Sequence, residues 1–415
     1  MIDYIRMGVT DAYNFNLCLI FLWLVAHEMG CTWDGAADCI NLVNDQPSRP
    51  EGTKRHLVHV FPTFAIGGSQ SRFRQLAIAH GGRYRHTVLA LDGVLDMAKS
   101  IPSGPAVTCV QPQLDKTLGL RNLPLIRRSL KQQQPDVLVT YNWGAIEWCL
   151  ANRYFPLAPH IHIEDGFGPE EASRQLPRRV WLRRLALSGL HTKVVLPSRQ
   201  LEGIAHTIWR LPKRTILYVP NGIDCARFSG LTTGVTRAGS LVIGTVATLR
   251  REKNLARLIR SFSAIAEEQP ETALKLVIVG DGPERRALET IARETRRGAQ
   301  IIFTGATSAP ERALAEMDIF ALSSDTEQMP LSILEAMASS LPICSVAAGD
   351  VAEMVAEENR PFIVGLSDET GFRHSLRSLI ADKDLRDRVG RANRAAALKR
   401  FDHTLMVARY LELFG

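Results

Sequence analysis

Short apolar runs alternate with helical patterns along most of the chain, starting at His56. Such runs, bounded by polar loops, predict the strands of parallel sheets linked by helices, and so an α/β fold. In the first half the predicted strands are His56 to Phe61, His86 to Leu91, Val107 to Val110, Asp136 to Tyr141, His160 to Ile163, Val194 to Leu196 and Ile216 to Val219. In the second half they are Leu241 to Val246, Leu274 to Val279, Ile301 to Phe303, Ile319 to Leu322 and Ile343 to Val346.

A polar segment divides this alternation into two halves. Residues 229–240 (SGLTTGVTRAGS) are rich in Gly, Ser and Thr, which predicts a linker. We therefore predict two doubly wound, Rossmann-like domains that face each other across a ligand-binding cleft. The predicted parts are an N-terminal extension (1–53), a first domain (54–228), the linker (229–240), a second domain (241–400) and a C-terminal helix that packs back toward the first domain (401–415).

Composition narrows the class of protein. The chain has 415 residues, 46% of them hydrophobic and 22% charged, which is typical of a soluble globular protein. Its seven cysteines include no Cys-x-x-Cys pair, so a reducing compartment such as the cytoplasm is expected. The apolar run from Phe15 to Ala26 is too short for a membrane span of about 20 residues. The formal charge of +7 favours an acidic partner, although it also fits a merely solubilising surface.

Two glutamates flank a predicted helix start in the second half. Glu327 lies in the polar loop after the strand Ile319 to Leu322, and Glu335 lies in an apolar helical run that begins at Pro330. Free backbone N–H groups at Leu331 and Ser332, together with the helix dipole, would form an anion site that suits a diphosphate. An ordinary loop carboxylate and a surface glutamate remain the alternative for such a pair taken alone.

Two nucleotide-binding fingerprints are absent. Gly280 and Gly282 follow a strand and open a helix, but the third glycine of the dinucleotide fingerprint is replaced by Arg285. No Gly-Lys-Ser/Thr phosphate loop occurs either. A redox cofactor is therefore not expected. Nucleic acid is not among the expected partners either.

A series of motifs in order resembles the retaining glycosyltransferase family 4 (glycosyl transferases group 1). These motifs are FAIGGSQSRFRQLA, VPNGIDCARF, IGTVATLRREKNLARLIRSF, LVIVGDGPERRALE, FTGA and MDIFALSSDTEQMPLSILEAMASSLPICSVAAGDVAEMV, within residues 56 to 400. The resemblance implies a GT-B fold and transfer of a hexose from an NDP-sugar to a saccharide or lipid-linked acceptor. No cofactor and no metal ion are expected, because fixed cations and amides can stabilise the departing diphosphate.

The resemblance also implies roles for residues of the second domain. Lys253 would contact the phosphates, and Arg250 would replace the arginine that the family carries at the position of Thr248. Glu335 would bind the ribose hydroxyls, and Glu327 would face the reacting end of the donor sugar. The remaining donor-binding candidates in this domain are Gly280, Gly282, Gly305, Gln328, Met329, Pro330 and Leu331, and those in the first domain are Gly67 and Gly68.

The first domain departs from the family pattern. A histidine often precedes the glycine that corresponds to Gly166, whereas this chain has Asp165, which is either a polar contact to substrate or a turn residue. Asn142 and Trp143 follow a predicted strand and are acceptor-site candidates, although tryptophan is more often a core residue. His160 and His162 are expected to be satisfied structural residues rather than metal ligands.

A basic segment predicts contact with an anionic membrane. Its arginines share a helix-like stretch with apolar residues, so they would hold the protein on the inner face of a membrane beside a lipid-linked acceptor. A solvated helix face is the alternative. These arginines are Arg174, Arg178, Arg179, Arg183 and Arg184.

Two other functions stay open. A GT-B-type epimerase acting on a nucleotide sugar would isomerise the donor without an acceptor. A non-catalytic subunit would bind nucleotide sugar yet neither hydrolyse nor transfer it, and the departures at Thr248 and Asp165 favour this alternative slightly.

Overall fold

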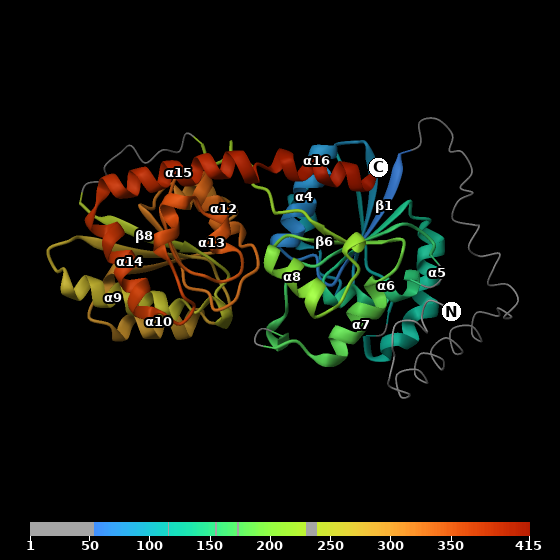
Figure 1. Ribbon diagram of the computed structural model, residues 1–415, viewed down its shortest axis with the longest axis horizontal. Coiled ribbons are helices and arrows are strands. Elements are labelled where there is room, and N and C mark those ends of the chain that lie inside the picture. The colour runs from blue at the N-terminus through green and yellow to red at the C-terminus, as the bar shows by residue number, and fades with distance from the viewer. Residues whose placement is uncertain (1–53, 115, 154–155, 172–173, 230–238) are drawn as a thin grey trace, which may run out of the picture.

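The computed structural model describes residues 54–114, 116–153, 156–171, 174–229 and 239–415. The predicted extension 1–53 and most of the predicted linker lie outside these ranges. Two α/β domains lie side by side, and the last helices of the chain run along both (Figure 1).

The first domain contains a parallel sheet of seven strands in the order β3-β2-β1-β4-β5-β6-β7. The strands are β1 (Arg55–Phe61), β2 (Tyr84–Ala90), β3 (Ala106–Val110), β4 (Val137–Tyr141), β5 (His160–Ile163), β6 (Thr192–Leu196) and β7 (Ile216–Tyr218). Its helices are α4 (Gly68–His80), α5 (Leu123–Gln133), α6 (Ile146–Arg153), α7 (Pro177–Leu187) and α8 (Arg199–Thr207). The central strands are buried on both faces, which is why they are almost continuously apolar.

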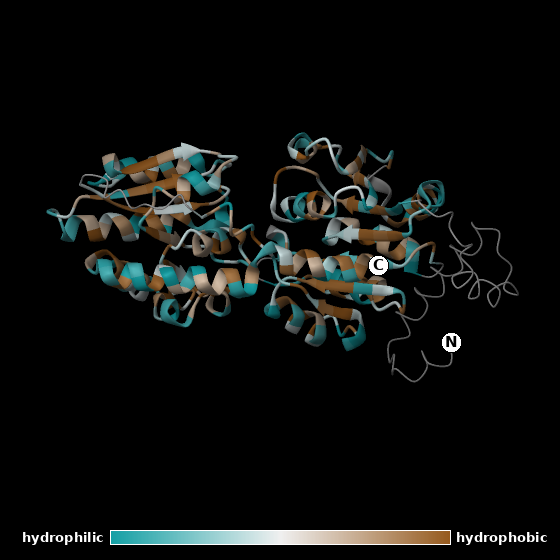
Figure 2. Cartoon of the chain, turned by 90° about the horizontal axis from the view of Figure 1, so that it is seen from above, coloured by the Kyte–Doolittle hydropathy of each residue, from teal (hydrophilic) through white to brown (hydrophobic). Residues whose placement is uncertain are grey.

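The second domain repeats this plan with six parallel strands in the order β10-β9-β8-β11-β12-β13. The strands are β8 (Leu241–Val246), β9 (Leu274–Val279), β10 (Ile301–Gly305), β11 (Ile319–Leu322), β12 (Ile343–Val346) and β13 (Ile363–Val364). Its helices are α9 (Leu255–Glu268), α10 (Arg285–Glu294), α11 (Pro310–Leu314), α12 (Leu331–Ala338), α13 (Val351–Met354), α14 (Glu369–Ala381) and α15 (Lys383–Phe401). The last helix of the chain, α16 (His403–Phe414), follows α15. In both domains hydrophobic strands lie between helices with polar outer faces (Figure 2).

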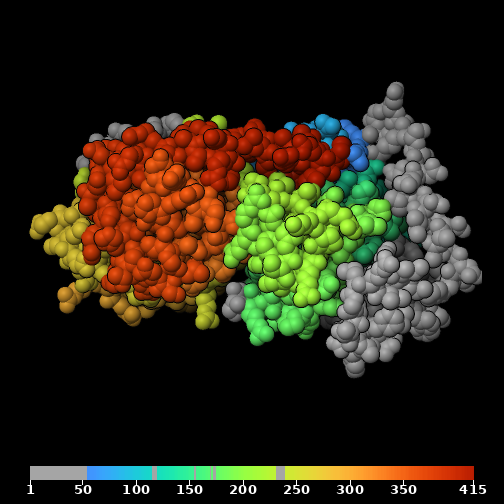
Figure 3. Space-filling view, in the orientation of Figure 1, coloured from blue at the N-terminus to red at the C-terminus, as the bar shows by residue number. Residues whose placement is uncertain are grey.

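Helices α15 and α16 join the two domains at the C-terminus. They form one ridge across the top of the molecule, drawn in red in Figure 3. Helix α16 packs against α4, and its Tyr410 and Phe414 are buried in the core of the first domain. The chain therefore crosses back from the second domain to the first at Asp402, whose carboxylate caps the start of α16.

The prediction of an α/β fold with two parallel, Rossmann-like domains is confirmed. Every predicted strand is present, with ends that differ by at most two residues. Strand β13 was not predicted, because two residues are too few to show a strand pattern. The helix predicted from Pro330 is α12, in which Pro330 is the N-cap.

Candidate active site

Both sheets reverse their strand order at one point, between β1 and β4 in the first domain and between β8 and β11 in the second. Ligands of open parallel sheets bind at the carboxyl ends of the strands at such points. A cavity of about 340 Å³ lies between the two domains there. Its lining includes eight of the predicted site residues, which are Gly68, Asp165, Lys253, Glu327, Gln328, Met329, Pro330 and Leu331.

Lys253 and Glu327 form an ion pair in this cavity. The Lys253 Nζ donates to Glu327 Oε1 at 2.6 Å, and the exposed fractions of the two side chains are 22% and 10%. Their loops are also tied together by the backbone, since the N–H of Asp325 donates to the carbonyl of Glu252 at 2.8 Å. The loops after β8 and β11 therefore hold a cation and a carboxylate in fixed positions, although 74 residues separate them in the chain.

Two helix N-termini open into the same cavity, one from each domain. Gly68 begins α4 and Leu331 begins α12, and neither helix has a side-chain N-cap hydrogen bond. A Cβ added at Gly68 would lie 3.7 Å from Leu331 Cδ1, so the two starts face each other closely. The first N–H groups of a helix have no intrahelical partner and carry partial positive charge. With Lys253, they make this cavity suitable for an anion with two phosphates.

The loop after β11 reaches across to the first domain. The Ser198 hydroxyl donates to Gln328 Oε1 at 3.2 Å, and the Asn221 side-chain amide donates to the Met329 carbonyl at 3.1 Å. Behind the loop, Gly349 adopts φ +60°, and a Cβ there would come within 2.4 Å of the Gln328 carbonyl oxygen. Only glycine fits at this position without moving the loop.

A further contact joins the domains at the start of α8. The Asp350 carboxylate accepts hydrogen bonds from the N–H groups of Arg199 at 2.6 Å and Gln200 at 3.0 Å. A carboxylate from the second domain therefore caps a helix of the first. This contact therefore helps to hold the two domains in the arrangement that the structure shows.

Asp165 is held by a buried arginine that the sequence analysis missed. The Arg72 guanidinium donates to both oxygens of Asp165, at 2.6 Å and 2.7 Å, and to Asn221 Oδ1 at 2.8 Å. Asn142 accepts a hydrogen bond from the N–H of Asp165 at 2.7 Å. The nearby Asp165 charge raises the pKa of Arg72 further above its usual value, against the opposing effect of burial. Arg72 lies within FAIGGSQSRFRQLA and Asn221 within VPNGIDCARF, but their letters alone give no sign of this contact.

The predicted glycines of the second domain lie behind the cavity rather than in its lining. A Cβ at Gly280 would come within 1.8 Å of the Ala247 carbonyl oxygen, and one at Gly282 within 2.5 Å of that of Leu249. The Gly280 N–H donates to the Gly305 carbonyl at 2.8 Å. These glycines therefore allow the loop after β8, which carries Lys253, to lie tightly against the neighbouring strand ends.

Glu335 lies one turn into α12 and is partly buried. Burial raises the pKa of its carboxyl group to about 7, with a further upward contribution from Glu311 and an opposing one from Arg227. Glu335 does not line the cavity of about 340 Å³. With a pKa of about 7, this carboxyl group is partly protonated at neutral pH, and the protonated form can donate as well as accept hydrogen bonds.

Four other predicted residues lie outside the cavity lining. Arg250 is exposed, whereas Thr248 lines the cavity, so the structure does not place Arg250 where the family carries its arginine. Gly67 is the N-cap of α4. Asn142 accepts a hydrogen bond from the backbone N–H of Asp165. The ring of Trp143 packs against the guanidinium group of Arg183, whose Cζ lies 4.9 Å from the ring centroid.

The expectation of a membrane-facing surface of five arginines is wrong for two of them. The Arg183 side chain is fully buried, where it pairs with Glu171 at 2.9 Å and Glu164 at 3.4 Å. Arg179 pairs with Glu170 and Glu171. A buried guanidinium needs such partners to offset its loss of hydration, and sequence spacing does not reveal them.

The histidines of β5 belong to a hydrogen-bonded cluster inside the first domain. Cys149, His160 and His162 place one potential ligand atom each within 4.8 Å of the others. The Thr140 hydroxyl lies 2.8 Å from His160 Nε2 and 2.9 Å from His162 Nδ1. Both buried rings thus have protein partners, as expected for structural histidines.

Two parallel-sheet domains whose switch points share one cavity define the GT-B class of architecture. Comparison with known proteins supports this assignment to the GT-B class. The family model described as Glycosyltransferase Family 4 matches residues 66–227, and that described as Glycosyl transferases group 1 matches residues 235–396. The chain belongs to this family of GT-B glycosyltransferases.

Individual relatives are distant. The chain is 26% identical over 280 residues to the UDP-Gal:alpha-D-GlcNAc-diphosphoundecaprenol alpha-1,3-galactosyltransferase of Escherichia coli, covering 64% of this chain and 72% of that protein. It is 24% identical over 181 residues to the N-acetyl-alpha-D-glucosaminyl L-malate synthase of Bacillus anthracis, covering 44% of this chain and 46% of that protein. The chain spans about half the length of several curated relatives that it matches.

Solved structures share the fold. The Anabaena protein HepE in complex with UDP and glucose superposes with a TM-score of 0.71 at 17% identity, over 86% of this chain and 99% of that one. In the part of the chain that the structure describes, no helix is both long and apolar enough to span a membrane.

Proposed function

We propose that the protein is a glycosyltransferase that moves a hexose from a nucleoside-diphosphate sugar to a saccharide or lipid-linked acceptor, with retention of configuration and without a metal ion. The proposal rests on one observation above all. Two uncapped helix starts and Lys253 converge on a single cavity between the domains, and this combination of charges would suit a diphosphate.

The proposed reaction is a substitution at the anomeric carbon of the donor. The bond between the anomeric carbon and the diphosphate oxygen breaks, and charge builds up on the diphosphate, where Lys253 and the start of α12 stabilise it. The acceptor oxygen bonds to the anomeric carbon on the face that the diphosphate leaves. The acceptor proton passes to the departing diphosphate. Glu327, which holds Lys253 at 2.6 Å, would position this cation and face the donor sugar.

Relatives support the choice of substrates. The Escherichia coli relative is named as a galactosyltransferase that uses UDP-Gal and a diphosphoundecaprenol-linked sugar. The Anabaena structure contains UDP and glucose. A nucleotide sugar and a lipid-linked saccharide are therefore the first substrates to test.

The site itself can be tested with one pair of variants. Nucleotide sugars are first screened by thermal shift, and the stabilising donor is then incubated with candidate acceptors. Glu327→Gln is expected to lower transfer at least about 100-fold while the melting temperature stays close to that of the wild type. Glu358→Gln is the control, because this glutamate is exposed on the same domain. Equal turnover in Glu327→Gln and the wild type would contradict the proposal.

The same incubations separate the two other functions. Isomerised donor in the absence of acceptor would indicate an epimerase. Binding of the donor with neither hydrolysis nor transfer for any acceptor would indicate a binding subunit. An analysis of the product's anomeric configuration decides whether the configuration is retained, and activity in excess EDTA decides whether a metal ion is needed.

A lipid-linked acceptor would place the protein at the cytoplasmic face of a membrane as a peripheral protein. Arg178 is exposed on α7, and Arg174 and Arg184, in the same segment of the chain, have no buried partner like that of Arg179 and Arg183 among the described residues. These cations would attract anionic lipid. Flotation with vesicles tests this part of the proposal, and equal recovery with neutral and anionic lipids would remove it.

A further inference from the structure

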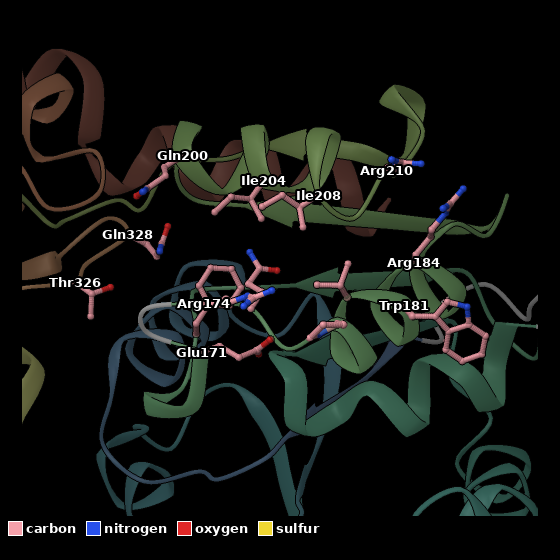
Figure 4. A pocket seen from close by; sticks show the side chains of 14 residues that line it. Glu171, Arg174, Trp181, Arg184, Gln200, Ile204, Ile208, Arg210, Thr326 and Gln328 are labelled. Atoms are coloured by element: carbon pink, nitrogen blue, oxygen red, sulfur yellow. The ribbon is translucent and has the colours of Figure 1, made fainter. Parts of the chain in front are cut away.

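A second and larger cavity adjoins the first. It has a volume of about 740 Å³ and runs between α7 and α8 toward the loop after β11, as Figure 4 shows. Gln328 lines both cavities, so they meet at this residue. We call the larger one the acceptor groove. Its size is in the range of roughly 300–1,000 Å³ that is usual for sites of drug-sized ligands.

The acceptor groove is electropositive. Arg174, Arg184 and Arg210 line it, and within the described part of the chain none of these three guanidinium groups has a hydrogen bond or ion pair. The one carboxylate in the lining, Glu171, is already engaged by Arg183 at 2.9 Å. Among the residues that the structure describes, the three cations therefore have no counter-charge, and an anionic ligand would supply one.

The acceptor groove also has an apolar wall. Ile204 of α8 and Ile208, the residue that ends this helix, lie on one side of the groove in Figure 4, and Trp181 of α7 lies on the other. Val180 of α7 also lines the groove. Ile208 is 45% exposed, so this part of the wall is open to contact with a ligand. In Figure 4 Gln328 and Thr326 lie at one end of the groove, and Arg184 and Trp181 at the other.

We propose that the acceptor groove binds a prenyl-diphosphate-linked saccharide, with its reacting sugar beside Gln328, its diphosphate on the arginines and its first isoprenoid units on the apolar wall. This inference deepens the proposed function and rests on it. A neutral lipid would leave three guanidinium groups without counter-charges. A water-soluble oligosaccharide would leave the aliphatic side chains of Ile204 and Ile208 without an apolar partner. A diphosphate that carries a hydrocarbon chain would supply a counter-charge for the three arginines and an apolar partner for the wall of the groove.

Isothermal titration calorimetry with geranylgeranyl diphosphate tests this proposal. The donor cavity is first filled with the nucleoside diphosphate that the thermal-shift screen selects, so that the probe cannot bind there. The wild type is expected to bind geranylgeranyl diphosphate at least about 10-fold more tightly than geranylgeraniol, because a hydrogen bond to a charged group contributes about that factor. It is expected to bind inorganic pyrophosphate at least about 10-fold more weakly as well, because pyrophosphate buries no hydrocarbon on the apolar wall. Equal affinity for pyrophosphate would mean a simple anion site and would overturn the proposal. Equal affinity for geranylgeraniol would mean a neutral-lipid site and would overturn it as well.

Matched arginine variants locate the binding. Arg184→Gln and Arg210→Gln are each expected to weaken binding of geranylgeranyl diphosphate about 10-fold or more. Arg178→Gln is the control, because Arg178 lies on the same helix, is exposed and does not line the acceptor groove. Equal weakening in all three variants, or in none, would contradict the assignment to this groove.

A donor-site variant separates this inference from the proposed function. Glu327→Gln is expected to lose transfer and yet bind geranylgeranyl diphosphate with wild-type affinity, since Glu327 does not line the acceptor groove. If no donor is ever transferred while the probe still binds in an arginine-dependent way, the glycosyltransferase proposal fails and the groove remains a prenyl-diphosphate site. If transfer proceeds but the arginine variants bind the probe normally, only the groove proposal fails.

Discussion

Replacing Lys253 by methionine tests the source of leaving-group stabilisation. Lys253 contributes the cation that lies in the cavity, and its Nζ is 2.6 Å from Glu327 Oε1. At an effective dielectric constant of about 20, two unit charges at this separation attract each other by roughly 6 kcal/mol before the cost of desolvation. A diphosphate oxygen at a similar distance would gain an interaction of this kind, and it would strengthen as charge develops on the leaving group.

Loss of one such fixed donor typically costs about 100- to 1,000-fold in kcat, or roughly 3–4 kcal/mol. We therefore expect Lys253→Met to lower kcat by this factor, measured as release of nucleoside diphosphate at saturating donor and acceptor. The variant also leaves the Glu327 carboxylate without its partner at an exposed fraction of 10%. A decrease of about 1–3 kcal/mol in the free energy of unfolding is expected for that reason.

A double variant separates the two effects. Lys253→Met combined with Glu327→Gln removes both charges, so stability should return toward the wild-type value while activity stays low. Lys383→Met is the control, because Lys383 makes a 2.7 Å ion pair with Asp387 on the surface of α15, where such pairs contribute little. Turnover of Lys253→Met within threefold of the wild type would refute this account of catalysis.

Three further predictions concern stability and loop geometry. Asp165→Ala removes the ion-pair partner of the buried Arg72 and is expected to lower the free energy of unfolding by about 3–5 kcal/mol, measured by chemical denaturation. An unchanged free energy of unfolding would contradict this prediction. The carboxyl group of Glu335 has a pKa of about 7 in the folded protein, above its unfolded value. Its ionisation is therefore less favourable in the folded state, and the folded protein loses stability as pH rises from about 4.5 to 7. Glu335→Gln should therefore be more stable than the wild type by up to about 3 kcal/mol at pH 8 and not at pH 4.5; the same difference at both values would refute this. Gly349→Ala should displace the loop after β11 and lower transfer at least about 10-fold, whereas Gly203→Ala, with open space around its Cβ, should leave activity unchanged.

The strands could be predicted because their physical requirement is local. A strand buried on both faces of a parallel sheet is mostly apolar, and its few polar side chains, such as those of His160 and His162, need hydrogen-bond partners. Polar loops separate such strands from their helices. Strand β13 has only two residues, so it carries no pattern of this kind and depends on pairing with β12.

The candidate site could be predicted only in part. The loop after β11 and the start of α12 were found because proline, glutamate and an apolar run share one short segment. Arg72 was missed because it lies in a helix whose spacing gives no hint of a carboxylate 93 residues away. Arg183 was placed on the surface because five arginines on one segment resemble a solvated face, whereas its partners, Glu164 and Glu171, come from the segment that follows β5.

The sequence alone determined the α/β class, the division into two domains and the family. Local patterns and motif order are sufficient for these conclusions, since each depends on residues that are close in the chain. Only the tertiary structure decided which charges meet. The strand order places β11 beside β8, which brings Glu327 to Lys253, and the packing of α7 hides Arg183 while it leaves Arg184 in the acceptor groove. Such pairings depend on distances in space, and no pattern along the chain encodes them directly.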